Sequence, residues 1–348
     1  MNISEDILHI PRFRMELAPE TDSIVQATIA KGELASGTAL LELEVAFTDQ
    51  TNRQYALACS NGFSALHLAL LALNLEGKKI AMPAISSCMA ILNAIRAAKA
   101  EPLFVDVEKG SPNISVEALA DLNFDAIITP NYFGKQSALQ AMSKFDLPII
   151  EDCAQSAGTE FLFNSQSPSH VKIFSFYPTK IINGIDGGMV CTDSQDVFEK
   201  AKDFMYYGGK RENDHVQRYN YKMSNVNAAF ANAQLKNLEA ICKRRIAIAD
   251  ALKEAINEPH QCLYETGHVP QKFILKVANA QDRDGMMEEL RNRGIPASTE
   301  LNPMPAEGLG AFENARDWHA RHFSLPCYEA LSDEELDYML FNVREVIK

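Results

Sequence analysis

The sequence predicts an α/β fold: a mostly parallel, seven-stranded-type sheet with helices on both faces, followed by a smaller C-terminal α+β domain. Short apolar runs alternate with helical patterns from residue 55 to residue 205, which is the rhythm of βαβ units. After Ser224 the composition changes to long helical patterns with few strands. The 348 residues are enough for a large core and a second domain. We expect a large domain at residues 1–235 and a small domain at 236–348.

The large domain is expected to begin with an N-terminal arm of about ten residues. Apolar runs bounded by polar or Gly residues predict strands, and patterns with a 3.6-residue period predict helices. In chain order the predicted helices are Thr21–Leu34, Leu40–Thr48, Ser64–Leu75, Cys88–Lys99, Ser115–Leu122, Ser137–Phe145 and Ser194–Met205. The predicted strands are Tyr55–Cys59, Lys79–Met82, Pro102–Val107, Ala126–Thr129, 148–150, 171–176 and Gly188–Thr192.

The small domain is expected to follow one long helix over 226–256. It would contain a strand at Phe273–Val277, a helix at Arg283–Arg293, a strand near Ala297, and helices at Ala315–His322 and Asp333–Val346. Within the expected large domain, a Gly-Gly pair at 208–209 precedes a mostly charged segment at 210–214, which predicts a mobile loop.

Composition excludes several classes of protein. The net charge of −13 argues against a nucleic-acid partner, because phosphate binding needs clustered Lys and Arg. The seven cysteines are odd in number and form no C-x-x-C pair, so we expect neither a disulfide framework nor a zinc site. Reduced thiols, no signal peptide and no long apolar run favour a cytoplasmic protein without a membrane partner.

Two polar residues follow predicted buried strands. Asp152 closes the apolar run 148–150, and Lys180 follows the run 171–176. Both therefore lie at strand ends, where open α/β sheets bind ligands. A Lys amine and an Asp facing one crevice suit pyridoxal phosphate (PLP). The Lys forms a Schiff base with the cofactor aldehyde, and the Asp keeps the pyridinium nitrogen protonated, so that the ring acts as an electron sink.

Four stretches, in the right order, resemble the DegT/StrS family of sugar aminotransferases, which are fold-type-I PLP enzymes. They are the phosphate-loop-like residues 59–66, the Glu-Asp-Cys-Ala-Gln run at 151–155, the Phe-Ser-Phe-Tyr-Pro-Thr-Lys run at 174–180, and the Tyr-Asn-Tyr-Lys-Met-Ser run at 219–224. The C-terminal third resembles the family more loosely. The resemblance implies an aminotransferase that uses PLP, with Lys180 and Asp152 in the roles given above.

The strand–Gly–helix turn at 60–64 is expected to bind the cofactor phosphate through backbone N–H groups and the helix dipole. Alone, such a turn is mostly just a turn. Gly62 allows close backbone approach. The family usually has Thr where this chain has Phe63, so Phe63 offers only its N–H. By resemblance, Ser175 is a phosphate ligand, and Asn220 reaches the phosphate from the other subunit of a dimer; otherwise Asn220 is a turn residue.

By the same resemblance Gln155 donates to the phenolic oxygen of the ring. The alternative is that Asp152 and Gln155 form a capping box for the next helix. The family also stacks an aromatic residue on the ring, from the stretch that is 83–89 here. This chain has no aromatic residue in that stretch, so Ile85, Cys88 or Met89 is expected to cover the ring.

On the substrate side, the resemblance implies glutamate as amino donor and a nucleotide-linked keto sugar as acceptor. Charged residues of the loop that reaches across the dimer could bind the nucleotide, or could simply be solvated; they are Lys210, Arg211, His215 and Arg218. Lys222 stands where the family has Arg, so a bidentate contact is absent there. The segment 298–305 lacks the family's His, which predicts an altered acceptor pocket.

The sequence therefore predicts a homodimeric aminotransferase that makes amino sugars for a surface polysaccharide or a secondary metabolite. Two alternatives stay open. One is a PLP-dependent sugar dehydratase, which the presence of Lys180 disfavours, since dehydratases of the family replace this Lys. The other is a non-catalytic PLP-binding regulator, supported only by Phe63 and the missing aromatic residue.

Overall fold

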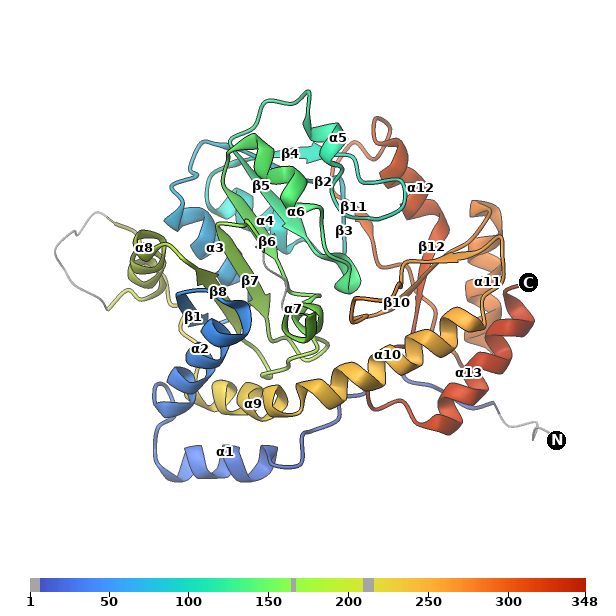
Figure 1. Cartoon of the computed structure of the whole chain (residues 1–348), viewed down its shortest axis with the longest axis horizontal. Coiled ribbons are helices and arrows are strands. Elements are labelled where there is room, and N and C mark those ends of the chain that lie inside the picture. The colour runs from blue at the N-terminus through green and yellow to red at the C-terminus, as the bar shows by residue number, and fades with distance from the viewer. Residues whose placement is uncertain (1–6, 164–166, 209–215) are drawn as a thin grey trace.

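A computed structural model describes residues 7–163, 167–208 and 216–348, and it contains a central sheet covered by helices on both faces (Figure 1). The predicted α/β architecture is confirmed. The sheet has seven strands in the order β1-β8-β7-β6-β5-β2-β4. Their bounds are β1 Tyr55–Cys59, β2 Lys79–Pro83, β4 Glu101–Val105, β5 Ala126–Pro130, β6 Ile149–Asp152, β7 Val171–Ser175 and β8 Gly188–Thr192.

Strand direction places the loops that carry the predicted site at one edge of the sheet. Strands β7, β6, β5, β2 and β4 are parallel, and β8 is antiparallel to both β7 and β1. Gly188 therefore pairs with the last residues of two strands, Ser175 and Cys59. Since the carboxyl ends of the parallel strands meet at this edge, the turn after β1 and the loop between β7 and β8 lie there together.

The strands are buried on both faces because helices cover each one. Leu57 and Cys59 of β1 belong to a core shared with α3, α4 and α8, whereas Ala56 and Ala58 pack on the other face with α2 and α9. This is the alternation that a strand imposes on successive side chains. The large-domain helices are α1 Thr21–Ala30, α2 Thr38–Thr51, α3 Gly62–Ala72, α4 Ala90–Ala97, α5 Val116–Leu119, α6 Leu139–Met142, α7 Ala157–Phe163, α8 Gln195–Met205 and α9 Asn225–Lys236.

A buried ionic network fills the space between the sheet and α7. Lys172 of β7 bonds to Glu160 of α7, and its Nζ lies 3.8 Å from an Oε2 atom of Glu151 on β6. Glu151 also accepts hydrogen bonds from Asn131 Nδ2 at 2.8 Å and from Ser169 Oγ at 2.9 Å. Burial of this kind is tolerated only when the charges are paired and hydrogen-bonded, and here they are.

A smaller antiparallel sheet with the order β12-β10-β9 forms the base of the C-terminal part. A separate core joins this sheet to the helices around it. The elements are α10 Leu238–Glu254, β9 Gln261–Cys262, β10 Phe273–Lys276, α11 Ala280–Asn292, α12 Glu313–Arg321, β12 His322–Leu325 and α13 Asp333–Val346. A separate two-stranded antiparallel ladder pairs β11 Asn302–Pro303 with β3 Ile85–Ser86, which follows β2 of the large sheet. Two short 3₁₀ helices lie at Tyr132–Gly134 and Ser143–Phe145.

Several element predictions were wrong in detail. The single helix expected over 226–256 is two helices, α9 and α10, which meet at Asn237 (Figure 1). The Asn237 side chain donates to the carbonyl of Ala233 at 3.2 Å, and such local side-chain bonds compete with the helical ladder. The strand expected near Ala297 is only an isolated bridge between Ser298 and Ser324. Strand β12 and helix α7 were not predicted.

The N-terminal arm crosses to the C-terminal part and is fastened there. Ile10 N donates to the carbonyl of Gly294 at 2.9 Å, and Arg14 makes a two-pronged contact with Glu335 at 2.7 and 3.0 Å. The Phe13 and Tyr328 rings meet edge to face, with centroids 5.9 Å apart. The arm therefore belongs structurally to both parts. Among the described residues, no helix is both long and apolar enough to cross a membrane.

Candidate active site

Six of the seven predicted site residues gather around one cavity of about 630 Å³ at the carboxyl edge of the large sheet. They are Gly62, Phe63, Asp152, Gln155, Ser175 and Lys180. Their segments are far apart in the sequence and are joined by the strand order β1-β8-β7-β6. The seventh residue, Asn220, is exposed and does not line this cavity in its own subunit.

The predicted phosphate loop is a helix N-terminus built against β7. The Asn61 side chain caps α3 by accepting from Ser64 N at 2.8 Å. A Cβ on Gly62 would lie only 2.8 Å from Ser175 Cβ and 3.1 Å from Ser175 Oγ. The close approach of the turn after β1 to the end of β7 therefore requires glycine at position 62. The arrangement leaves backbone N–H groups of the first helical turn beside the Ser175 hydroxyl, a suitable pair of donors for a phosphate.

Phe63 lines the cavity and also packs inward, where its ring centroid lies 6.0 Å from that of His67. The hydroxyls of Ser60 and Ser64 bond to each other at 2.7 Å. Neither of these serines lines the cavity, whereas Ser175 does. Ser175 is therefore the hydroxyl best placed to replace the contact that a Thr would make at position 63.

Asp152 points away from the buried ionic network because neighbouring residues on a strand face opposite sides of the sheet. Its Oδ1 accepts from Ala154 N at 2.9 Å, and this is the one hydrogen bond to its carboxylate within the described part of the chain. Burial raises the pKa of Asp152, while the Ala154 N–H and the charge of Lys180 oppose the rise. A buried carboxylate with one engaged oxygen can accept a charged N–H from a ligand.

Gln155 does not form the capping box considered above. Its Oε1 accepts from Phe133 N at 2.9 Å, and its Nε2 donates to Ser87 Oγ at 2.8 Å. These two bonds fix the orientation of the amide and leave its second N–H available at the cavity. This position agrees with a donor to a ligand oxygen.

Lys180 lies in the loop between β7 and β8, after Thr179. The Thr179 carbonyl accepts from Gln271 Nε2 at 3.1 Å, so the C-terminal part holds the loop from the other side of the cavity. Burial lowers the pKa of Lys180, and the negative charge that Cys88 and Asp152 contribute opposes the shift. A lowered pKa makes the neutral, nucleophilic amine more abundant at neutral pH.

Of the three residues expected to cover a cofactor ring, Cys88 alone lines the cavity. Ile85 is fully buried in a neighbouring apolar cluster and pairs with Pro303. Met89 is exposed and lies outside the lining. The stretch 83–89 thus contributes two small side chains to the cavity, those of Ser87 and Cys88, where the resemblance implies an aromatic ring.

Sequence reasoning gave no role to several polar lining residues, among them Ser87, Asp186, Gln271, Lys272 and Glu300. Lys272 and Gln271 immediately precede a strand, a position that could have suggested them. Glu300 comes from the segment 298–305 that was expected to alter the acceptor pocket, and the structure does bring this segment to the cavity. Asp186 precedes the Gly-Gly turn at 187–188, and its Oδ1 accepts a hydrogen bond from Gly187 N at 2.9 Å.

Of the predicted nucleotide-binding residues, Arg218 is the one that lies in the described part of the chain, and it does not line this cavity. Arg218 pairs with Asp203 at 3.0 Å, and the Lys222 ammonium lies 4.0 Å from the centroid of the Tyr206 ring. Lys210, Arg211 and His215, together with most of the loop predicted to be mobile, lie outside the described residues. Neither Arg218 nor Lys222 lines the cavity in its own subunit.

Taken together, these residues fit PLP. The turn after β1 and Ser175 form a cradle for a phosphate, Asp152 offers a carboxylate for a protonated ring nitrogen, and the Lys180 amine has no ion-pair partner within 4.0 Å in the described part of the chain. Each feature rests on a different loop, and all three face the same cavity.

Comparisons with known proteins agree with this geometry. The model of the DegT/DnrJ/EryC1/StrS aminotransferase family matches residues 16–344. Solved structures with the same fold include a DegT DnrJ EryC1 StrS aminotransferase from Brucella abortus, with a TM-score of 0.84 and 24% identity over 94% of this chain and 95% of that one. The putative sugar aminotransferase Spr1654 from Streptococcus pneumoniae, in its PMP form, has a TM-score of 0.90 and 19% identity over 97% and 98%.

A third structure, Helicobacter pylori PseC, an aminotransferase involved in the biosynthesis of pseudoaminic acid, has a TM-score of 0.86 and 20% identity over 98% of this chain and 99% of that one. The family match covers nearly the whole chain, and the structures share its fold from end to end. The chain therefore belongs to the PLP-dependent DegT/DnrJ/EryC1/StrS aminotransferase family.

Proposed function

We propose that this protein transfers an amino group from glutamate to a keto group on a nucleotide-linked sugar. The observation that carries the proposal is the meeting of Lys180, Asp152 and the Gly62–Ser175 contact at one cavity. An amine, a ring-nitrogen partner and a phosphate cradle are the three parts that a PLP aminotransferase needs.

Each side chain has a role set by its position. The Lys180 amine attaches the cofactor, Asp152 holds the ring nitrogen in its protonated form, and Gln155 donates to the phenolic oxygen. The N–H groups of Gly62 and Phe63 and the Ser175 hydroxyl hold the phosphate. When bound, PLP withdraws electrons from the carbon that carries the amino group and so makes its proton acidic.

Lys180 is also the base of the reaction. The free Lys180 amine would lie beside the carbon that bears the amino group of the donor and would take up the proton that this carbon loses. Burial lowers the pKa of Lys180, which increases the fraction of neutral amine that can accept that proton. Loss of Lys180 therefore removes both the attachment point and the base.

The acceptor is a sugar because the sequence motifs resemble those of sugar aminotransferases. The structural neighbours also include a putative sugar aminotransferase and an aminotransferase involved in the biosynthesis of pseudoaminic acid. The pocket for this sugar differs from the usual one, since the segment 298–305 lacks the family's His and supplies Glu300 to the cavity. The product serves a surface polysaccharide or a secondary metabolite, and the enzyme works in the cytoplasm.

The active enzyme is a homodimer with shared sites, and the chain divides into residues 1–235 and 236–348. Asn220 supports the dimer, because it is exposed in its own subunit and absent from its own cavity. Tyr177 also supports it, because this large ring lines the cavity yet is 56% exposed. A partner subunit would cover Tyr177 and bring its own copy of Asn220 to the phosphate.

The first test is the visible absorption spectrum of the PLP-loaded protein before and after glutamate is added. The proposal expects a yellow protein that glutamate bleaches, and a Lys180→Ala variant that does neither. Yellow protein that glutamate leaves unchanged would point to another donor or to elimination, as in a dehydratase. Wild-type protein that never turns yellow would refute the role of Lys180 and leave a binding regulator.

The shared site is tested by mixing two inactive variants. Lys180→Ala and Asn220→Ala are each expected to lose most activity, because one lacks the amine and the other a phosphate ligand. In a mixed dimer one site has both native residues, so unfolding and refolding the two together should restore part of the activity. Failure to recover activity, or a monomer in sedimentation, contradicts the shared site.

A further inference from the structure

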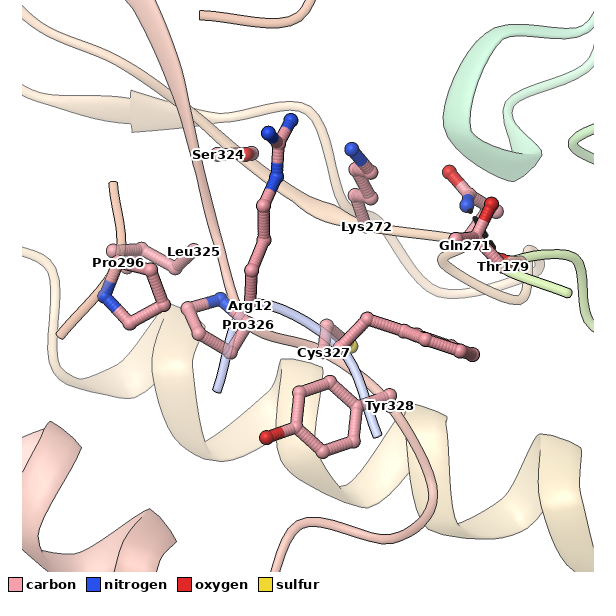
Figure 2. Close-up of a pocket in the computed structure, with 11 residues that line it drawn as sticks. Arg12, Thr179, Gln271, Lys272, Pro296, Ser324, Leu325, Pro326, Cys327 and Tyr328 are labelled. Carbon is pink, nitrogen blue, oxygen red and sulfur yellow. Dashed lines mark hydrogen bonds between the residues drawn. The ribbon is translucent and has the colours of Figure 1, made fainter. Parts of the chain in front are cut away.

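A second cavity, of about 390 Å³, opens beside the cofactor cavity and shares Thr179, Gln271 and Lys272 with it. One wall comes from the N-terminal arm, through Arg12 and Phe13. In Figure 2 the charged ends of Arg12 and Lys272 point to the same side of this cavity. Two cations that come from segments 260 residues apart, by the difference 272 − 12, thus face one space next to Lys180.

A single carboxylate, that of Glu300, holds the two cations in place. Arg12 Nη2 donates to Glu300 Oε1 at 3.0 Å, and Lys272 Nζ donates to Glu300 Oε2 at 2.5 Å. The hydroxyls of Ser298 and Ser324 also donate to Glu300 Oε1, at 2.9 and 2.6 Å. Both oxygens of the Glu300 carboxylate therefore accept hydrogen bonds, and the role of this carboxylate is to position Arg12 and Lys272.

The charges of this cluster do not cancel. Two cations and one carboxylate leave one positive charge at the mouth of the cavity. Arg12 uses only Nη2 among its guanidinium nitrogens within the described contacts, and Lys272 Nζ uses one bond. Donors remain on both side chains, and together they can bind one monoanionic group.

The backbone holds Arg12 at this position even though its side chain is 62% exposed. On the N-terminal side of Arg12, Ile10 N donates to the Gly294 carbonyl. On the C-terminal side, the Arg14 guanidinium donates to both carboxylate oxygens of Glu335. Tyr328 Oη donates to the carbonyl of Pro11 at 3.0 Å. The arm is thus fixed at residues 10, 11 and 14, and Arg12 lies on a supported segment.

We infer that Arg12 and Lys272 form the subsite that binds the carboxylate of the amino donor. The inference rests on the proposed function and extends it to the binding of the donor. In an amino acid the carboxylate is attached to the carbon that reacts beside Lys180, so it must bind within a few ångströms of that amine. Lys272 meets this condition, because it lines the cofactor cavity together with Lys180.

The diphosphate of a sugar nucleotide does not meet this condition. A sugar ring separates it from the keto carbon, so it binds farther from Lys180 when the keto carbon is in place. The net charge of one is also smaller than a diphosphate requires. The geometry therefore favours a carboxylate over a phosphate as the anion bound here.

Equilibrium binding of two probes to the PLP-loaded enzyme tests the inference by calorimetry. Glutarate carries carboxylates and no amine, so it binds without reacting, and uridine diphosphate carries the alternative anion. Arg12→Gln and Lys272→Gln should each weaken glutarate binding 10-fold or more and leave uridine diphosphate binding within 2-fold. Arg12→Lys, which keeps the charge, should recover part of the affinity.

Arg14→Gln is the matched control. It removes a charge from the same arm, but this Arg pairs with Glu335 and does not line the cavity, and the hydrogen bonds of Ile10 and Pro11 still hold the arm, so glutarate binding should change less than 2-fold. A 10-fold loss in Arg14→Gln as well would show that displacement of the arm, rather than a lost contact, weakens binding. If Lys272→Gln fails to fold because Glu300 loses its partner, Arg12→Gln decides alone, since its side chain is largely exposed.

The inference is overturned if wild-type enzyme does not bind glutarate, if Arg12→Gln binds it normally, or if the variants lose uridine diphosphate instead. Failure of the proposed function looks different. In that case glutarate binding depends on Arg12 and Lys272, but glutamate does not bleach the enzyme. If glutamate does bleach the enzyme but neither Arg12→Gln nor Lys272→Gln changes glutarate binding, the proposed aminotransferase function is supported and the proposed carboxylate subsite is wrong.

Discussion

Replacing Gly62 by alanine would add a methyl group where the phosphate loop touches β7. The new Cβ would lie 2.8 Å from Ser175 Cβ, about 0.7 Å inside the normal carbon–carbon contact of about 3.5 Å. Overpacking of this kind costs about 1–3 kcal/mol, and the better helix propensity of alanine returns about 0.5–1 kcal/mol. We therefore expect Gly62→Ala to lower the free energy of unfolding by about 1–2 kcal/mol.

The same change should weaken PLP binding. To relieve the contact, Ser175 must move away from Gly62, and its hydroxyl then leaves the phosphate cradle. A hydrogen bond to a charged group contributes about 1.5–3 kcal/mol, which corresponds to a roughly 10- to 100-fold increase in the Kd for PLP. Chemical denaturation of the cofactor-free protein and a fluorescence titration with PLP measure the two effects separately.

Gly285→Ala is the control for this experiment. Gly285 also lies within a helix, α11, but no atom lies within 4 Å of the Cβ that it would gain. We expect this variant to be up to about 1 kcal/mol more stable than the wild type and to bind PLP equally well. If Gly62→Ala behaves like Gly285→Ala, the contact with Ser175 does not constrain the loop and the reasoning is refuted.

Three further changes test other parts of the structure. Lys172→Met removes the cation from a buried ionic network and should cost about 3–5 kcal/mol of unfolding free energy in urea denaturation, because two carboxylates stay buried without it. Burial lowers the pKa of His322 to about 4, against about 6.5 when unfolded, so the unfolded chain binds the proton first as the pH falls. Stability should be complete above pH 6.5 and fall by roughly 3 kcal/mol by pH 4, and His322→Gln should reduce that slope. Asp152→Asn should still bind PLP and turn yellow, but glutamate should bleach it far more slowly in stopped-flow absorbance, because an amide does not keep the ring nitrogen protonated.

For each of these three predictions, one measured outcome would contradict the reasoning. Lys200→Met, at an exposed pair with Asp196, should cost less than about 1 kcal/mol, and an equal loss in Lys172→Met would contradict the importance of burial. A His322→Gln variant with an unchanged slope between pH 6.5 and 4 would assign the acid sensitivity to other groups. Bleaching of Asp152→Asn at the wild-type rate would remove Asp152 from the ring site.

Much of the fold follows from local sequence. Strand β1 and helix α13 lie at the predicted residues, because an apolar run with polar ends and a capping box with a 3.6 period are local signals. The break at Asn237 was missed because the apolar period continues across it, and the bond of the Asn237 side chain to the backbone is visible only in three dimensions. Strand β12 was missed because it follows α12 without an intervening turn residue.

The site residues, like the elements of the fold, were predictable where a local sequence signal carries them and not where the signal is three-dimensional. Residues carried by a motif, such as Lys180 and Gln155, could be proposed from the sequence, and both line the cavity. Arg12, Lys272 and Glu300 could not be linked in advance, because they come from three separate segments that meet only when the arm packs on the C-terminal part. Ile85 and Met89 were reasonable candidates for the ring, but burial in one case and exposure in the other exclude them from the cavity.

The opposite orientation of the Glu151 and Asp152 side chains on β6 affects the register of this strand in the sheet. A slip of β6 by one residue against its neighbours would exchange the two carboxylates, since the side-chain period of a strand is two. The longer Glu side chain would enter the cofactor cavity, and Asp152 would face Lys172, which is buried and bound to Glu160. The ionic network beneath α7 thus selects the alignment that presents the correct acid to the cofactor, although no member of the network touches the cavity.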